Sequence, residues 1–429
     1  MGDRFGIDKS FQTAVGAFKD NTAYWVLGHA FDTLLDCLHL CRPLDDKDQP
    51  SDWKDLAHMA LEKLHWLDGK PPPDCHEDPK PKFYAQGESW YDDSGWWVVA
   101  SLKAYLLAKK LGWGEYQEDF RKLCLAKWAR FDDNAPKVYD TSGKPGDGLD
   151  PLYPGGVWNS TWPNSPGDQC CTDLCDPTTS SLGGFQNTVT NMLYLVCAER
   201  LCQAHGDGFV APDASRADRE FKFLSDWFKP DRAKVDPLLN RFAGEKGPVV
   251  VRERVTAYHN GSRPNEYDAE QAWTGDQGIL LGGLIERAQR VPGEAETLLR
   301  FATDLIDGTL LYLNDGNGML LNWPLKLDAP GGAGDAYSTG FGVFMRYLTR
   351  ALDNDIVRQH VMGEKLLWRP NNDPHADPVM KTYRDLFRDM VGKVAKDDTP
   401  FGKQCSNASP LTVAVNDLAV RVLAFKLFA

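Results

Sequence analysis

Helical periodicity runs through almost the whole chain, and two kinds of helix alternate along it. Apolar residues recur at helical spacing in about a dozen segments, and almost no stretch shows the period-two alternation of a strand. Some of these helices are apolar on every side, such as 188–196, and others are charged and amphipathic, such as 118–123. A helix that is apolar all round must be covered on all sides, whereas an amphipathic helix covers only one. The alternation therefore predicts inner helices wrapped by outer ones, an all-α fold of the (α/α)6 toroid type.

The expected helices have ordinary lengths, and their ends are uncertain by about two to four residues. They cover 11–18, 22–40, 53–67, 94–111, 116–131, 187–204, 217–228, 270–290, 294–311, 338–352, 378–394 and 411–427. No composition shift or long linker divides them, so residues 1–429 are expected to form a single (α/α)6 domain.

Charge and composition exclude several classes of function. The formal charge of −13 and the lack of a Lys/Arg block argue against a nucleic-acid partner and favour a neutral or polar ligand. No apolar run is long enough to span a bilayer. The cysteines lack a second pair or a His-x-x-x-His companion, so we expect no metal and no cofactor.

Cysteine usage and the amino terminus bear on location. Ten cysteines, three of them at Cys170, Cys171 and Cys175 in a loop-like segment, mildly favour an oxidising compartment and some disulfides. Three N-x-S/T triplets, which begin at Asn159, Asn260 and Asn407, are compatible with secretion. The amino terminus has no apolar signal region, so the protein is either soluble or lacks its leader. Because of the cysteines and the triplets, we expect a secreted, extracellular protein whose leader is absent from this chain.

Two consecutive carboxylates, Asp92 and Asp93, stand at the start of an aromatic-rich helical segment. A glycosidase needs one carboxyl group to attack or stabilise the anomeric carbon and another to protonate the leaving oxygen. Asp at a helix start is also a common cap, because its oxygen accepts from free backbone N–H groups. A second pair, Asp132 and Asp133, shows how common the bare signal is, since it reads as a solvated helix exit.

Five segments resemble, in the same order along the chain, motifs of glycoside hydrolase family 76, the α-1,6-mannanase family that includes fungal enzymes acting on cell-wall mannan. The resemblance spans roughly 85–350, most of the expected toroid. The segments are Asp-Asp-Ser-Gly-Trp-Trp at 92–97, Gly-Gly-Val-Trp at 155–158, 186–191 with 198–201, 273–283 and 342–348.

The resemblance implies a retaining glycoside hydrolase with Asp92 as nucleophile and Asp93 as general acid/base. Neighbouring carboxylates suit the short separation of about 5 Å in a retaining enzyme. The implied substrate is an oligosaccharide or polysaccharide with α-linked mannose, cleaved in the manner of an endo-α-1,6-mannanase. The family's Lys is replaced by Gln186, its Tyr-Asn by Gly275-Asp276 and its Met-Ala by Ser94-Gly95, so the chemistry is better supported than the sugar.

Loops on a rigid scaffold concentrate binding residues, and the loops that enter the expected inner helices carry Gly, aromatic and amide side chains. We expect Trp158 and Trp273 to stack on sugar rings and Trp96 and Trp97 to lie in the core. The alternative for each Asn is a helix cap or a satisfied core amide. The candidates for hydrogen bonds to sugar hydroxyls are Asn187, Asn191, Asp276 and Gln277.

Other functions remain open at this stage. A toroid of this kind also suits an unsaturated-uronyl hydrolase or a sugar epimerase, although an epimerase is expected to rely on paired histidines. A noncatalytic carbohydrate-binding toroid would use the aspartates only as caps. Hydrolysis and transglycosylation are both compatible with the carboxyl pair, and we expect a monomer.

Overall fold

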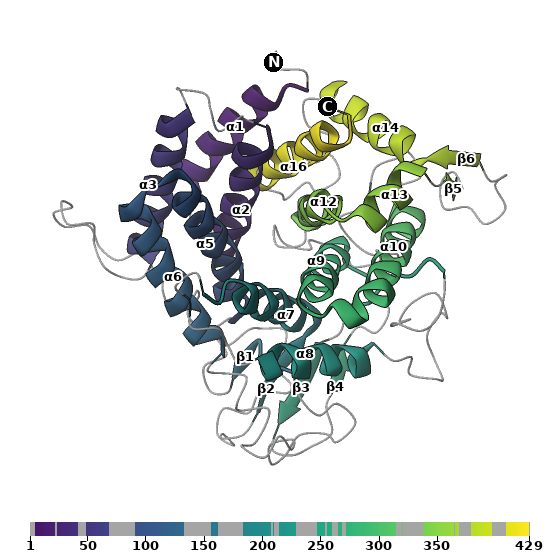
Figure 1. Ribbon diagram of the computed structural model, residues 1–429, viewed down its shortest axis with the longest axis horizontal. Helices are drawn as coiled ribbons and strands as arrows, with labels where there is room; N and C mark the ends of the chain where they lie inside the picture. Colours follow the sequence, from purple (N-terminus) through teal and green to yellow (C-terminus); the bar gives the residue numbers. More distant parts are fainter. Residues whose placement is uncertain are drawn as a thin grey trace.

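The structure is a computed structural model, and its helices form a closed double-layered ring (Figure 1). It describes residues 5–21, 24–41, 49–67, 91–132, 156–161, 183–206, 209, 214–228, 247–253, 255–259, 265–267, 272–314, 320, 338–363, 365–368, 379–396 and 409–428.

Six helices make the inner layer, and each packs against the next around the ring (Figure 1). The ring closes because the last inner helix packs against the first, which brings the two ends of the chain together. The inner helices are α2 (Tyr24–Cys41), α5 (Tyr91–Leu111), α7 (Thr188–Gln203), α9 (Thr274–Arg290), α12 (Gly340–Ala351) and α16 (Pro410–Phe428).

The outer helices each pack against an inner partner or against a neighbour in the outer layer. A short 3-10 turn, Pro292–Glu294, leads from α9 into the outer layer. The outer helices are α1 (Ile7–Asp20), α3 (Gln49–Leu67), α6 (Gly114–Asp132), α8 (Ala214–Trp227), α10 (Ala295–Tyr312), α13 (Asp355–Gly363) and α14 (Tyr383–Lys396).

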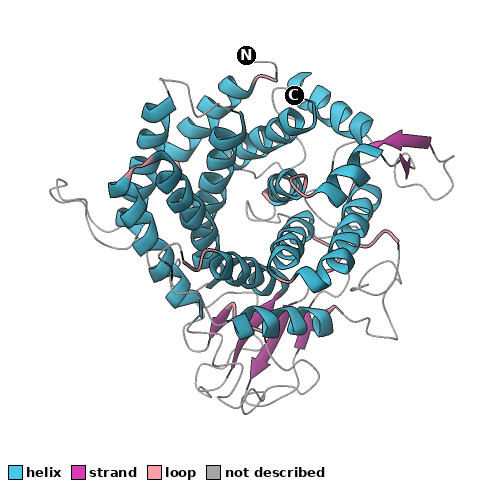
Figure 2. Cartoon of the chain, viewed as in Figure 1, coloured by secondary structure: helices cyan, strands magenta, loops and turns pink. Residues whose placement is uncertain are grey.

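Two small antiparallel sheets lie at the edge of the ring (Figure 2). The four-stranded sheet has the order β1 (Ser160–Thr161), β2 (Gly183–Asn187), β3 (Val255–His259) and β4 (Asn265–Tyr267). Its register pairs Asn187 with Val255, so β3 is fixed at the point where β2 runs into α7. The second sheet pairs β5 (Lys365–Trp368) with β6 (Val379–Thr382).

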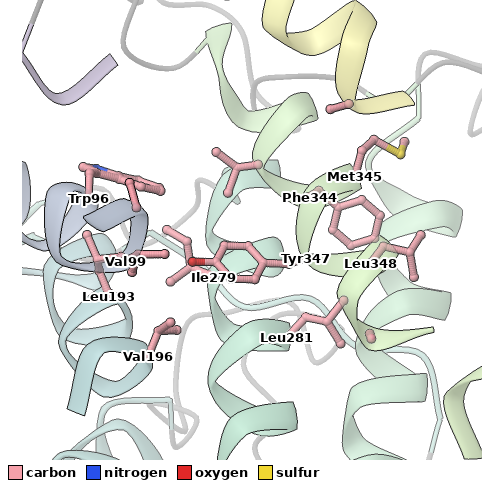
Figure 3. Packing of buried hydrophobic residues seen from close by; sticks show 14 of the residues in the cluster. Trp96, Val99, Leu193, Val196, Ile279, Leu281, Phe344, Met345, Tyr347 and Leu348 are labelled. Atoms are coloured by element: carbon pink, nitrogen blue, oxygen red, sulfur yellow. The ribbon is translucent and has the colours of Figure 1, made fainter. Parts of the chain in front are cut away.

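The main core is built from buried apolar side chains of both the inner and the outer helices. Figure 3 shows Tyr347 extending from α12 toward Ile279 and toward the α5 side chains Trp96 and Val99. The inner helices approach closely at Gly278, where a Cβ would lie 2.6 Å from the backbone Cα of Phe344. Glycine is therefore the residue that permits the contact between α9 and α12.

The predicted (α/α)6 architecture is confirmed, and each predicted helix has a counterpart in the ring. Three features differ from the sequence prediction. The prediction has no helix over Asp355–Gly363, which is α13. The predicted helix over 378–394 begins too early, because Val379–Thr382 pairs with β5 as a strand. The third difference is the four-stranded sheet, whose short strands do not show a period-two pattern long enough to detect.

The state of the cysteines and the search for a membrane-spanning helix can be given for the described residues. Cys41, Cys124 and Cys197 are free thiols, whereas Cys170, Cys171 and Cys175 lie outside the described residues. No helix that the structure describes has the length and apolar character needed to cross a bilayer.

Candidate active site

The amino-terminal ends of three inner helices meet at one face of the ring. The backbone N–H of Tyr91, the first residue of α5, donates to the carbonyl of Asn159 at 2.8 Å. Asn159 leads directly into β1, and β1 pairs with the strand that enters α7. The segment 247–253 then crosses to α9, where Val251 is bonded to Gln277. These contacts gather the starts of α5, α7 and α9 around one group of side chains.

Asp92 and Asp93 lie in the first turn of α5 and are partly exposed. Burial of the carboxyl group raises the pKa of Asp92 to about 7, and the nearby charge of Glu253 adds to the rise. Hydrogen bonds from the backbone N–H groups of Asp93 and Asp92 oppose it; the one from Asp93 reaches Oδ1 at 3.1 Å. Burial also raises the pKa of Asp93 well above its usual range, the Asp92 carboxylate raises it further, and Arg130 lowers it. Both carboxyl groups thus have pKa values raised above the usual range, which solvated cap residues do not have.

Two further carboxyl groups belong to this cluster. Asp276 lies in the first turn of α9 and is fully buried. Burial raises the pKa of Asp276 well above its usual range, and the charge of Glu253 adds to the rise. The charge of Glu253 therefore raises the pKa of both Asp92 and Asp276.

The Asn side chains predicted to bind sugar hydroxyls make hydrogen bonds to the backbone around the site. Asn187 is the N-cap of α7, and its side chain accepts from the N–H of Thr190 at 3.1 Å. Asn191 accepts from the N–H of Val157 at 2.7 Å and donates to the carbonyl of Asn187 at 2.7 Å. These bonds match the alternative of a cap or a satisfied core amide, and sugar binding by either Asn stays an untested prediction.

Gln277 likewise makes hydrogen bonds to the backbone of the segment before β3. Its Oε1 accepts from the N–H of Val251 at 2.8 Å, and its Nε2 donates to the carbonyls of Val251 at 2.7 Å and Trp273 at 3.0 Å. A fourth amide, Asn416 on α16, holds the start of α12: its Nδ2 donates to the carbonyl of Ser338, and its Oδ1 accepts from the N–H of Gly342. Amides near the start of inner helices thus fix the backbone around the site, and contact between Gln277 and a sugar also stays an untested prediction.

The burial of the tryptophans agrees with the prediction for one pair and differs from it for the other. Trp96 and Trp97 are buried in the core, as predicted. Trp158 and Trp273 are each only 4% exposed, so neither ring offers the open stacking surface that the sequence suggested. The ring of Trp273 lies against Gly275, where a Cβ would come within 2.4 Å of it. This packing gives a physical reason for glycine at the position where the family motif has tyrosine.

The turn before Trp158 also requires glycine. Gly156 has φ of +80°, and a Cβ on it would lie 2.6 Å from both Oδ1 of Asn191 and Cζ of Phe223. Only a residue without a side chain combines this backbone conformation with these close neighbours. The Gly-Gly-Val-Trp motif therefore fixes the path of the loop that anchors α5.

Sequence reasoning missed three residues at this site. Glu253 lies in a segment without a motif, and only the fold brings it near Asp92. Arg130, near the end of α6, supplies positive charge to Asp93. Asn159 is 6% exposed, and its side-chain Oδ1 has no hydrogen-bond partner among the described residues, which makes it a candidate for binding a sugar hydroxyl. Its burial also disfavours glycan attachment to this N-x-S/T triplet in the folded chain.

The comparison pair of aspartates is not a solvated helix exit. The carboxylate of Asp132 accepts from the hydroxyl of Tyr194 at 2.6 Å and forms an ion pair with Arg216 on α8. Asp133 lies outside the described residues. The prediction for Asp132 was wrong because the ends of α6, α7 and α8 converge there, which sequence periodicity does not report. Across the described ranges, no group of three or more His, Cys, Asp and Glu residues is arranged to hold a metal ion.

Solved structures similar to this chain include α-1,6-mannanases of glycoside hydrolase family 76. The chain is similar to the GH76A α-1,6-mannanase from Salegentibacter sp. HEL1_6, with 15% identity, coverage of 97% of this chain and 98% of that chain, and a TM-score of 0.59. An inactive variant of that enzyme, with two consecutive aspartates replaced by alanine and α-1,6-mannotetrose bound, is similar at 15% identity, 97% and 99% coverage and a TM-score of 0.58. The likeness confirms at the level of the fold the resemblance drawn from the motifs.

A further structure of the same enzyme carries asparagine at both aspartates and α-1,6-mannotriose. It is similar at 14% identity, with coverage of 97% and 99% and a TM-score of 0.55. No protein-family model and no curated protein matches the sequence.

Proposed function

We propose that the chain is a retaining glycoside hydrolase that acts on α-linked mannose-containing glycans, in the manner of an endo-α-1,6-mannanase. The single observation that carries the proposal is the pair Asp92-Asp93 in the first turn of inner helix α5, where both carboxyl groups have raised pKa values. Titratable groups perturbed by burial and by a specific neighbour are typical of catalytic sites.

The two aspartates fit different roles. Asp93 has its pKa raised well above its usual range, which suits a general acid that must hold a proton for the leaving oxygen. Asp92 has a pKa of about 7, and its charge helps to raise the pKa of Asp93, so Asp92 is the member of the pair that suits the ionised nucleophile. Once Asp92 forms a glycosyl-enzyme ester its charge is gone, so Asp93 can ionise more easily and act as base toward the incoming water or acceptor.

The fold supports the substrate class. Structures of the similar mannanase hold α-1,6-mannotetrose or α-1,6-mannotriose in variants inactivated at two consecutive aspartates. This chain also has consecutive aspartates at an inner helix start, although its Gly275-Asp276 departs from the family motif. We therefore place α-1,6-linked mannose first among the candidate substrates.

The direct test combines a substrate screen with substitutions. Purified protein is incubated with α-1,6-mannotetraose, other α-mannosides, α-glucosides and wall polysaccharides, and product sizes separate endo from exo cleavage. Asp92→Asn should abolish cleavage, because an amide cannot form the covalent intermediate. Asp93→Asn should lower the rate on natural linkages by about 10²- to 10⁴-fold, with a smaller loss on aryl mannosides whose leaving groups need less protonation.

A matched control separates catalysis from capping. Asp8 lies in the first turn of outer helix α1 and is exposed, so Asp8→Asn changes the same residue type at the same helical position away from the site. Asn caps a helix about as well as Asp, so caps alone would leave all three variants active. Full activity of Asp92→Asn and Asp93→Asn on a substrate that the wild type cleaves would refute the catalytic assignment.

A further inference from the structure

The amino-terminal ends of α2 and α5 lie side by side at the face of the ring that holds the candidate active site. Near these ends, the indole N–H of Trp97 on α5 donates to the backbone carbonyl of Tyr24 on α2 at 2.9 Å. Farther along the two helices, Lys103 of α5 forms an ion pair with Asp36 of α2 at 2.7 Å. Early residues meet early residues and later ones meet later ones, so the two helices run parallel. The start of α2 therefore borders the turn of α5 that carries Asp92.

One aromatic side chain at this border, Trp25, is partly exposed and rests on a fixed base. Trp25 lies in the first turn of α2, and its ring packs against Trp96 of α5 with the ring centroids 5.9 Å apart and the planes at 36°. Trp96 is itself held from the other side, because Cζ of Arg346 lies 5.7 Å from its ring centroid and the ring of His29 meets it edge-on at 5.8 Å. Glycine at position 28 lets α2 come this close, since a Cβ on Gly28 would lie 3.2 Å from Cβ of Trp96.

The same base connects Trp25 to the candidate nucleophile. Trp96 follows Asp92 by four residues in the continuous helix α5. Side chains four residues apart share one face of a helix, and each leans toward the amino-terminal end, over the preceding turn. The ring of Trp96 therefore lies on the face of α5 that carries Asp92, and Trp25 packs against that ring. The partly exposed ring of Trp25 thus borders the Asp92 carboxyl group.

The other partly exposed aromatic rings at these helix ends already have cations over them. Nζ of Lys127 lies 5.3 Å from the ring centroid of Tyr24, and Cζ of Arg130 lies 5.9 Å from that of Tyr91. In the described part of the chain, no cation lies over the ring of Trp25. The two loop tryptophans that the sequence suggested as stacking surfaces are each only 4% exposed. Trp25 is therefore the aromatic side chain at these helix ends that best suits contact with a ligand.

We propose that Trp25 is a stacking surface for a pyranose ring of the glycan, next to the linkage that the aspartates would cleave. The inference deepens the proposed function and rests on it for the identity of the sugar. A pyranose presents C–H groups on one side, and these pack favourably on the electron-rich face of an indole ring. Because Trp96 already holds the ring of Trp25, binding costs little side-chain freedom. The surface belongs to an inner helix rather than to the entrance loops.

The first test detects the sugar at Trp25 without any need for cleavage. The Asp92→Asn protein is labelled with 5-fluorotryptophan, and its ¹⁹F NMR spectrum is followed as α-1,6-mannotetraose is added. Trp25→Phe identifies the resonance of Trp25 by its loss, and this resonance should shift as the site fills. Trp113 is the matched control, because it is also partly exposed and its ring packs against another tryptophan, Trp53 of α3, at 6.0 Å in the outer layer. The resonance of Trp113 should not move.

The second test measures affinity by calorimetry in the same Asp92→Asn protein. Trp25→Ala should weaken binding of α-1,6-mannotetraose by about tenfold, as expected for the loss of one aromatic stacking contact. Trp25→Phe keeps an aromatic face and should lose less, and Trp113→Ala should bind like its parent. In the protein that retains Asp92, Trp25→Ala should raise KM more than it lowers kcat, because stacking is present in both the ground state and the transition state.

Unchanged affinity in Trp25→Ala, an unmoved Trp25 resonance, or an equal loss in Trp113→Ala would overturn the inference. Failure of the Asp92→Asn protein to bind α-1,6-mannotetraose would overturn it as well. Should Trp25→Ala not fold, the ¹⁹F shift and the affinity of Trp25→Phe decide the question. A chain that binds the tetraose through Trp25 but cleaves no glycoside would refute the proposed function alone, whereas cleavage that Trp25→Ala leaves unimpaired would refute this inference alone.

Discussion

Substitution of Glu286 by glutamine should cost this protein a large part of its stability, because Glu286 joins the carboxy-terminal ends of three inner helices. Its Oε1 accepts from Nε of Arg200 on α7 at 2.9 Å and from Nε of Arg350 on α12 at 2.5 Å. Glu286 itself is fully buried in α9, and Gln203 donates to its backbone carbonyl at 2.8 Å. The ion pairs thus fasten the face of the ring opposite the candidate active site.

The pKa of Glu286 gives the magnitude. Burial alone would raise this pKa, but the charges of Arg350 and Arg200 outweigh it and lower the pKa from 4.5 to about 2. At about 1.4 kcal/mol for each tenfold change in proton affinity, this corresponds to about 3 kcal/mol. Loss of the charge also leaves Arg200 buried without its partner, and breaking a buried pair typically costs about 3 to 5 kcal/mol. Arg350 is 39% exposed, so water screens part of its share and the lower figure is the better expectation.

Denaturant unfolding followed by circular dichroism measures this loss. The folded-state pKa of Glu286 is depressed, so its contribution is fully present above pH 4.5 and disappears as the pH falls toward about 2. The difference in unfolding free energy between wild type and Glu286→Gln should therefore be large at pH 7 and shrink as the pH falls below 4.5. Glu296→Gln is the control, since Glu296 forms an exposed pair with Arg300 on α10 and its loss should be too small to measure. Equal effects of the two substitutions at pH 7, or a difference that does not change with pH, would refute this reasoning.

Three further predictions concern the core and the cysteines. Gly278→Ala should destabilise the protein, because its Cβ would meet the backbone of Phe344 at 2.6 Å, whereas Gly16→Ala, with nothing within 4 Å, should be neutral or stabilising; thermal unfolding compares the two. Burial raises the pKa of Cys124 to about 12 and that of Cys197 well above its usual range, so neither thiol should react with a thiol reagent at pH 8 until the protein is unfolded. Thiol counting in denatured, non-reduced protein should find fewer than ten free thiols, and ten would remove the main support for an extracellular location.

The sequence by itself determined the class of fold. Helical spacing of apolar residues is local information, and the contrast between strongly apolar segments such as 188–196 and charged amphipathic ones such as 118–123 already separates inner from outer helices. The adjacency of Asp92 and Asp93 at a helix start is also written in the chain. Their side chains come from one helical turn and therefore stay close in any fold that keeps the helix.

Tertiary structure decided which groups surround that pair. Glu253 is about 160 residues from Asp92 along the chain, and only the anchoring of 247–253 to α7 and α9 brings the two charges together. Burial likewise changed Trp158 and Trp273 from expected platforms into packed rings, and hydrogen bonds gave Asn191 and Gln277 their backbone partners. A pattern of residue types specifies what each side chain is able to do, whereas neighbours from distant segments decide which charge, partner or surface it meets. For this reason the sequence alone predicts the ring of helices and the candidate catalytic residues. The charges and burial that shift the pKa values at the site follow only from the packing of α5, α7 and α9.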